Sequence, residues 1–230
     1  MRYIYCHPLF DERKCSHRFS FQLSETFKQK GLILERFDYN GTGETEGIFG
    51  SVTMESLRND LKTHVCNNKV CLIGVRFGAS LAFDFCCASS GFVRNLILIA
   101  PVMTGADYVD YLFRKQRIKD LITGGPADIL KEHGFYNLEG YKTSEKFIEQ
   151  IREFSLIKEA DRFEVKNFVR IAQISAGSKI IPQLDSFSKL LRKANLKIEI
   201  ESFSLPEFWE RIPDTDYSSL TQKILEWCHD

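Results

Sequence analysis

Short apolar runs alternate along this chain with longer stretches in which apolar residues recur every three or four positions. Runs of the first kind are typical of strands in a parallel sheet, and the longer stretches are typical of the amphipathic helices that connect them. The run "NLILIAP" at residues 95–101 is apolar on both faces, as a central parallel strand should be. The pattern predicts an α/β fold with strands at residues 3–6, 33–37, 70–73, 96–100, 169–175 and 197–202, and helices at residues 16–30, 54–65, 77–89, 184–194 and 218–228.

One interval breaks this alternation. Between Pro101 and Phe168 we find no convincing strand, and helical patterns cover residues 106–122, 126–134 and 143–154, with turn signals at 123–126 and 137–141. The interval is about 65 residues long, whereas a plain crossover needs about a dozen. We therefore expect a core of residues 1–102 and 166–230, and a helical lid inserted at 103–165 over the carboxyl edge of the sheet, where open α/β sheets bind ligands.

The first helix of this interval carries a basic stretch, "FRKQRIKD", at residues 113–120. We interpret the stretch as a solvated helix face, and a surface for a membrane or an anionic partner is the alternative. The apolar side of the helix is expected to consist of Tyr108, Tyr111, Leu112, Ile118, Leu121 and Ile122.

Composition limits the function classes. The 230 residues suit one domain with an insertion, and the 43% hydrophobic content is that of an ordinary globular protein. The 31 basic and 31 acidic residues cancel, so no long-range attraction to nucleic acid or to an anionic membrane is expected. No apolar run approaches about 18 residues, so we expect no transmembrane segment.

The seven cysteines show no pattern typical of a metal site or of a disulfide framework. Cys66, Cys71, Cys86 and Cys87 lie in or beside apolar segments, which suits buried free thiols. The N-terminal residues lack the apolar core of a signal peptide. These features favour a cytoplasmic location, with neither a metal nor a cofactor.

Three motifs lie at or directly after the ends of the first three predicted strands, in chain order. "HPLFDERKCSHR" (residues 7–18) follows the first predicted strand, "RFDYNGTGETEG" (36–47) includes the end of the second, and "LIGVRFGAS" (72–80) ends the third. These pieces resemble the α/β-hydrolase superfamily, in which a sharp G-x-S-x-G turn presents the nucleophilic serine. The resemblance implies an α/β-hydrolase fold: a mainly parallel sheet of about six strands, helices on both faces and an inserted helical lid.

The chain is more closely similar to the exosortase-associated hydrolases. All three motifs carry this resemblance, and the first two are the specific ones when taken together. It extends to residues 100–116 ("APVMTGADYVDYLFRKQ"), 138–147 ("LEGYKTSEKF") and 205–209 ("LPEFW") and so covers most of the chain. The name of the family implies a hydrolase, but the resemblance does not specify which reaction is catalysed.

The resemblance also implies where a catalytic triad would lie. The nucleophile position holds Arg76, the positions expected for the acid hold Gly177, Ser178 and Lys179, and the region expected for the histidine holds Glu207. A Ser-His-Asp mechanism needs all three roles filled. Ordinary serine hydrolysis is therefore not expected.

Two other residues are weak catalytic candidates. The resemblance places His17 beside the pocket, and Glu12 lies on the same loop. Either side chain has the chemistry of a general acid or base.

The donors that would stabilise an oxyanion remain in place. We expect the N–H of Phe77 and an N–H near Leu9 or Phe10 to point into the pocket, and Arg76 adds a permanent charge with a planar set of donors. This combination indicates a site for a small-molecule anion or an acyl ligand. In the alternative, Arg76 pairs with Glu12 or another acid and fills the pocket, and the sequence leaves both interpretations open.

Three functional hypotheses follow. The first is an α/β-hydrolase-fold protein with a degenerate triad that binds an anionic or acylated small molecule at this Arg-containing site. The second is an active hydrolase or acyltransferase on ester or thioester bonds with non-standard catalytic residues. The third is a non-enzymatic interaction protein of an exopolysaccharide or protein-sorting system, which rests on analogy of fold alone. The sequence does not indicate an oligomeric state.

Overall fold

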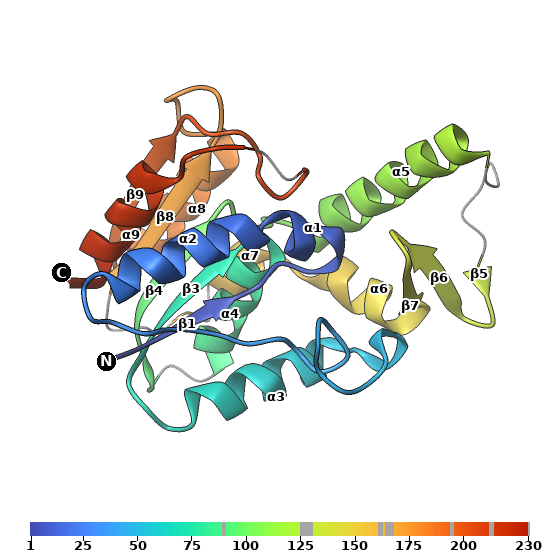
Figure 1. Ribbon diagram of the computed structural model, residues 1–230, viewed down its shortest axis with the longest axis horizontal. Coiled ribbons are helices and arrows are strands. Elements are labelled where there is room, and N and C mark those ends of the chain that lie inside the picture. Colours follow the sequence, from blue (N-terminus) through green and yellow to red (C-terminus); the bar gives the residue numbers. More distant parts are fainter. Residues whose placement is uncertain are drawn as a thin grey trace. The chain divides into compact units, whose positions relative to one another are not determined.

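The computed structural model describes residues 1–88, 91–124, 131–160, 163, 168–193, 196–211 and 214–229. The chain forms two compact units, each built from separate segments. The first consists of Met1–Phe37, His64–Met103 and Leu156–Asp230, and the second of Asp38–Thr63 and Thr104–Ser155. Figure 1 labels most of their helices and strands.

The first unit contains a six-stranded sheet in the order β2-β1-β3-β4-β8-β9, and every neighbouring pair is parallel. The strands are β1 (Arg2–Cys6), β2 (Leu34–Arg36), β3 (Val70–Val75), β4 (Val93–Ile99), β8 (Phe168–Ile174) and β9 (Lys197–Phe203). All six residues of β3 are buried, as expected for a central strand. The six strands predicted from the apolar runs are therefore confirmed, with ends that shift by at most three residues.

Helices cover both faces of this sheet. They are α1 (Phe10–Cys15), α2 (His17–Lys28), α4 (Phe77–Ala88), α7 (Leu156–Ala160), α8 (Pro182–Lys193) and α9 (Ser218–His229). On one face, α2 and α9 lie side by side (Figure 1) and pack Phe27 and Trp227 into one buried cluster with Tyr3 and Ile73 of the sheet. On the other face, α4 packs on β3 and β4, and its Phe83 contacts Phe187 of α8 with 5.2 Å between ring centroids.

The helix α1 differs from the sequence expectation, which placed Glu12 on a loop. Phe10 begins the helix with φ of 54°, and Ser16 both ends α1 and precedes α2. The break at Ser16 leaves α1 only six residues long, too short to show a helical period in the sequence.

The second unit combines helices with a small antiparallel sheet. Its helices are α5 (Gly105–Thr123), α6 (Glu145–Glu153) and most of α3 (Met54–Val65), and a 3₁₀ turn covers Phe49–Ser51. Its strands are β5 (Lys131–Glu132), β6 (Phe135–Leu138) and β7 (Tyr141–Ser144), in that order in the sheet. The hydroxyls of Thr104 and Ser144 accept hydrogen bonds from backbone N–H groups at the starts of α5 and α6, so both helices are capped.

The expectation that residues 101–168 contain no strand is wrong. A hairpin of β6 and β7 turns at Glu139 and Gly140, both with positive φ, and β5 pairs with β6 where the sequence predicts a helix at residues 126–134. Residues 126–130 of that predicted helix lie outside the described residues. The hairpin strands are four residues long and partly exposed, so their side chains give no clear alternation.

Helix α5 buries only part of its predicted apolar side. Tyr108 and Leu112 are buried, whereas Ile118, Leu121 and Ile122 are 52%, 65% and 80% exposed. None of the helices in the described part of the chain combines the length and apolar character needed to span a bilayer.

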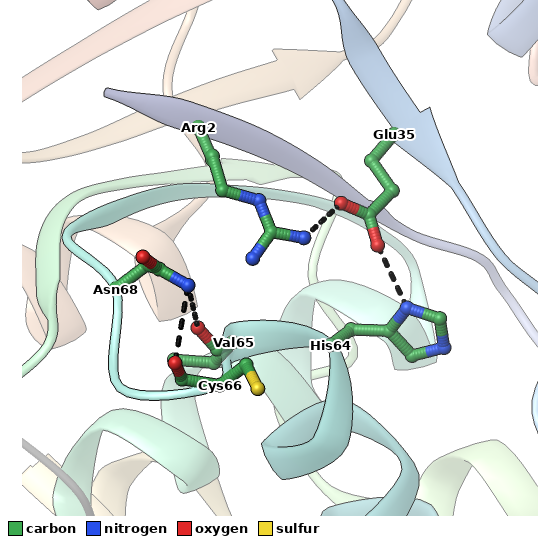
Figure 2. A network of polar contacts seen from close by, with 6 residues as sticks. All are labelled: Arg2, Glu35, His64, Val65, Cys66 and Asn68. Atoms are coloured by element: carbon green, nitrogen blue, oxygen red, sulfur yellow. Dashed lines mark hydrogen bonds and ion pairs between the residues drawn. The ribbon is translucent and has the colours of Figure 1, made fainter.

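A polar network joins β1, β2 and the end of α3 within the first unit (Figure 2). Glu35 of β2 accepts a hydrogen bond from Arg2, and its other carboxylate oxygen lies 2.7 Å from Nδ1 of His64. The His64 ring also stacks on Phe37, with 4.0 Å between centroids. In Figure 2 the Arg2 and His64 side chains converge on the Glu35 carboxylate, while Asn68 turns back to the carbonyl groups at the end of α3.

We predict that Glu35→Gln destabilises the protein in a pH-dependent way. Burial raises the pKa of Glu35, but the hydrogen bonds from His64 and Arg2 outweigh burial and the pKa is lowered overall. A lowered pKa means that the ionised form stabilises the fold above the ordinary glutamate pKa, and this contribution is lost as the pH falls through the folded-state value. The carboxylate is partly exposed, so we expect a loss of about 0.5–1 kcal/mol at neutral pH.

Urea unfolding of wild type and variant between about pH 7 and pH 3.5 measures this difference, which should shrink toward the acid end. Glu44→Gln, at an exposed loop position, is the control and should leave stability unchanged. An equal loss of stability at every pH would contradict the assignment.

Candidate functional site

The centre of the candidate site is a strand-to-helix turn at Arg76. Strand β3 ends at Val75 and α4 begins at Phe77, so Arg76 is the single connecting residue. Its φ is 53°, in the left-handed region, which costs a non-glycine residue about 1–3 kcal/mol. The Arg76 N–H donates to the carbonyl of Ile99 at 3.0 Å, and its carbonyl accepts from the N–H of Ala79 at 3.0 Å. The predicted elbow is therefore present as backbone geometry.

Two glycines make this turn sterically feasible. A Cβ on Gly74 would lie 2.4 Å from the Cα of Ala79, and a Cβ on Gly78 would lie 2.3 Å from the carbonyl oxygens of Cys6 and His7. All of these atoms belong to the backbone, so they can shift away from an added Cβ only if a strand or a helix moves. The glycine on each side of Arg76 therefore lets α4 start directly against β3 and the end of β1.

The Arg76 side chain is held from three sides. Its Nε donates to Oε1 of Glu12 at 3.1 Å, its Nη1 donates to the carbonyl oxygen of Ala100 at 3.4 Å, and its guanidinium carbon lies 4.8 Å from the ring centroid of Trp209. Glu12 is fully buried, while the Arg76 side chain keeps 18% exposure. The ion pair named in the alternative interpretation thus exists in the structure.

Burying this ion pair costs free energy, because both charges are removed from water. A buried carboxylate without a partner is strongly disfavoured, and here the guanidinium compensates its charge. The indole face of Trp209 adds an attraction of the cation–π type. The three contacts fix the plane of the guanidinium and hold a permanent cation at the strand-to-helix turn.

The predicted oxyanion residues lie near the ends of the same elements. Leu9 immediately precedes α1, Phe10 is its first residue, and Phe77 is the first residue of α4; all three are buried. Ser80, one turn into α4, donates its hydroxyl to the carbonyl of Val102 at 2.8 Å, so its hydroxyl is used in packing.

His17 lies elsewhere. It begins α2 and helps to line a pocket of about 380 Å³ together with His7, Arg13, Lys14 and Arg18. The structure thus joins Glu12 to Arg76 and places His17 among basic side chains, so the two weak catalytic candidates have different surroundings.

A larger groove of about 920 Å³ runs along α2 and α9. It mixes acidic and basic groups, including Glu25, Lys30 and Glu226, and its lining contains no residue of the elbow. Within the described ranges, no group of three or more His, Cys, Asp or Glu side chains is arranged to hold a metal ion.

Sequence reasoning missed two parts of this site. Trp209 lies in "LPEFW", which served only as a mark of resemblance, although its position after the last strand places it at the carboxyl edge. The basic lining of the pocket was visible as Arg13, Lys14, His17 and Arg18 in one short segment. Arg13 and Lys14 were assigned to a loop before the predicted helix, which hid the side that they share with His17 and Arg18.

We predict that Gly78→Ala disrupts the elbow. The added methyl group would meet two backbone carbonyls, so β1 and α4 would have to separate, at a cost of about 1–3 kcal/mol or more. Thermal unfolding monitored by circular dichroism measures the loss. Gly91→Ala is the control, because a Cβ there meets no atom within 4 Å, and a similar loss in both variants would contradict the packing argument.

We further predict that the effects of Glu12→Gln and Arg76→Gln on stability are not additive. The double variant should lose less stability than the sum of the losses in the two single variants. Removing one partner leaves the other charge poorly compensated, at a cost of about 2–4 kcal/mol when the pair is mostly buried. Urea unfolding of both single variants and the double variant gives the coupling energy. Strictly additive losses would show that the pair contributes no coupling.

Comparison with known proteins gives structural matches only. No family model matches this sequence, and no curated protein matches it at the sequence level. Among solved structures, Est1E from Butyrivibrio proteoclasticus with ferulic acid bound is similar, with a TM-score of 0.66, 14% identity, and coverage of 99% of this chain and 89% of that chain.

Two further structures agree with this match. A lipase-esterase related protein from Clostridium acetobutylicum has a TM-score of 0.63 and 12% identity, covering 98% of this chain and 93% of its own. Alpha/beta hydrolase domain-containing protein 10 from mouse has a TM-score of 0.58 and 15% identity, covering 99% of this chain and 89% of its own. The chain therefore has the α/β-hydrolase fold, as predicted.

Proposed function

We propose that this protein binds a small anionic or acylated molecule at the elbow and does not hydrolyse it through a serine nucleophile. The observation that carries the proposal is the Arg76 guanidinium, held by Glu12 and Trp209 at the turn where the resemblance expects a nucleophile. The fold supplies the scaffold for such a site, but the fold alone does not specify its chemistry.

The residues at the triad positions support a binding role. A guanidinium stays protonated at any physiological pH, so Arg76 cannot serve as a nucleophile or as a base. The loop after β8 carries Gly177, Ser178 and Lys179 where the resemblance expects an acid, and Glu207 follows β9 where it expects a histidine. We infer that the triad is degenerate at all three positions.

The held guanidinium favours an anion as the ligand. Glu12 fixes the Nε side of the group and Trp209 fixes its plane, so little side-chain order has to be gained when a ligand binds. The remaining 18% exposure leaves part of the side chain within reach of a small carboxylate or acyl oxygen. Phe77, at the start of α4, is the residue whose N–H we propose as the second donor.

Four parts of the proposal rest on the sequence alone. These are the membership of the exosortase-associated group, the cytoplasmic location, the donor N–H near Leu9 or Phe10, and the assignment of residues 103–165 to an inserted lid. Of that segment, residues 104–155 belong to the second compact unit, together with residues 38–63.

The test compares carboxylate binding with ester turnover. We predict that acetate or butyrate, at constant ionic strength, raises the melting temperature of wild type and that Arg76→Gln removes the response, because the cation that contacts the anion is gone. Arg117→Gln, at an exposed position of α5, is the control and should respond like wild type.

The same preparations are assayed with p-nitrophenyl acetate and p-nitrophenyl butyrate. We expect no turnover above buffer for any of them. An equal carboxylate response in wild type and Arg76→Gln would exclude the elbow as the binding site, and turnover by wild type would replace the binding role with the hydrolase or acyltransferase alternative.

A further inference from the structure

The last two turns of α5 expose a group of aliphatic side chains. Ile118, Leu121 and Ile122 are 52%, 65% and 80% exposed. Single exposed apolar residues are ordinary on a protein surface, but these three lie within five consecutive positions. They are three of the ten large apolar side chains that are exposed in the described part of the chain. Such clustering marks a surface with a function rather than ordinary scatter.

This group lies opposite the buried face of α5. Residues three or four positions apart share one face of a helix, so Ile118 lies beside both Leu121 and Ile122. The buried residues of α5 include Leu112 and Gln116. Leu121 follows Leu112 by nine positions, which is about two and a half turns and puts it on the opposite side. Helix α5 is therefore apolar on two sides, one buried and one exposed to solvent.

The contacts that hold α5 in the second unit come from residues before this group. The ring of Phe113 lies 5.1 Å from that of Tyr136 in β6, measured between centroids. The side chain of Gln116 accepts a hydrogen bond from the backbone N–H of Glu139 at the hairpin turn. The helix is thus anchored upstream of Ile118, and its last two turns contribute exposed apolar surface.

Cations flank the aliphatic group. Arg114, Arg117 and Lys119 are exposed, and their side chains make no hydrogen bond or ion pair with any residue that the structure describes. Lys115 is different, because it pairs with Glu139 at 2.7 Å and its charge is compensated. Three uncompensated positive charges therefore lie within the last three turns of the helix.

The neighbouring acids of α5 lie away from this group. Asp120 accepts a hydrogen bond from the side chain of the buried Gln116 at 2.7 Å, and Asp110 pairs with Arg152 of α6 at 2.8 Å. The exposed face thus combines aliphatic and basic side chains without an acid. We call the following six residues the α5 patch: Arg114, Arg117, Ile118, Lys119, Leu121 and Ile122.

The composition of the α5 patch suits an anionic lipid surface better than a protein partner. A stable protein–protein interface contains about 20–30 residues on each side, whereas the patch has six. Aliphatic side chains bordered by cations can insert between headgroups and acyl chains, and a lipid surface needs no complementary shape to receive them. The cations then lie close to the anionic headgroups, which attract them.

The zero net charge of the chain does not oppose such binding. Attraction to a charged surface acts within a Debye length, about 8 Å at physiological ionic strength. Only the charges of the face that meets the lipid therefore matter, and the α5 patch carries three cations and no acid.

We propose that the α5 patch docks this protein on membrane surfaces that contain anionic phospholipids. The three aliphatic side chains enter the boundary between headgroups and acyl chains, and the three cations contact the headgroups. This inference goes beyond the proposed function, because α5 belongs to the second unit and contains no residue of the elbow. Arg117→Gln stays a suitable control for the carboxylate test, since that test contains no lipid.

The experiment measures co-sedimentation of purified full-length protein with vesicles. One set of vesicles is phosphatidylcholine alone, and the other is equal parts of phosphatidylcholine and phosphatidylglycerol. The apolar variant is Leu121→Gln/Ile122→Gln and the charge variant is Arg114→Gln/Lys119→Gln. All four positions are exposed and glutamine is a good helix former, so α5 should remain folded, which melting curves verify.

Each variant has a matched control. Ile33→Gln replaces an isoleucine that is 83% exposed in the first unit, and Lys62→Gln/Lys69→Gln removes two exposed cations near the end of α3. These controls change surface hydrophobicity and net charge in the same direction as the patch variants, but at sites remote from the α5 patch in the sequence.

We expect wild type and both controls to bind the phosphatidylglycerol vesicles and to bind phosphatidylcholine alone far more weakly. Each patch variant should lose at least about tenfold in partition coefficient, because inserted aliphatic groups and surface cations each contribute several-fold. Binding by wild type should weaken as NaCl is raised, since salt screens exposed charges.

Two results with vesicles would overturn the proposal: no binding by wild type, or equal binding by the patch variants and their controls. Equal partition of wild type into both kinds of vesicle would overturn the role of the anionic headgroup. Sedimentation velocity tests the other occupant. A wild-type dimer that Leu121→Gln/Ile122→Gln dissociates, without vesicle binding, would assign the α5 patch to a second copy of the chain instead.

Discussion

The ion pair between Arg76 and Glu12 is the constraint around which the carboxyl edge of this sheet is organised. A fully buried carboxylate needs a partner, and the partner lies at a backbone position with φ of 53° in a tight strand-to-helix turn. The pair requires α1 to form, because α1 delivers Glu12, and it requires the segment after β9 to return, because that segment delivers Trp209. One guanidinium thus connects three segments that are far apart in the sequence.

Much of the fold was predictable from the order of apolar runs. Strands such as β3 and β4 are buried on both faces, and continuous apolar runs of that length between helical patterns have few other interpretations. The second unit was less predictable, since its hairpin strands β6 and β7 are four residues long and owe their pairing to a turn at Glu139 and Gly140. The sequence indicated a turn at residues 137–141, but the short, partly exposed strands on either side of it gave no alternation from which to predict a hairpin.

The candidate site was likewise predictable only in part. The spacing of Gly74 and Gly78 around Arg76 was enough to predict the elbow, because close backbone packing demands glycine there whatever the central residue is. The contact with Trp209 was not predictable, since it depends on how a loop returns after the last strand. The pocket followed from helix formation in α1 and α2, which brings Arg13, Lys14, His17 and Arg18 to one side, whereas an extended loop would scatter them.

The division of the chain into two interleaved units has a consequence for biosynthesis. The segments Asp38–Thr63 and Thr104–Ser155 of the second unit are separated by His64–Met103, which supplies β3, α4 and β4 of the first. A nascent chain therefore contains only the first segment of the second unit while the central strands are being synthesised. Neither unit is encoded by a contiguous gene fragment. Splitting the chain at any single point therefore leaves at least one unit without a complete set of its segments.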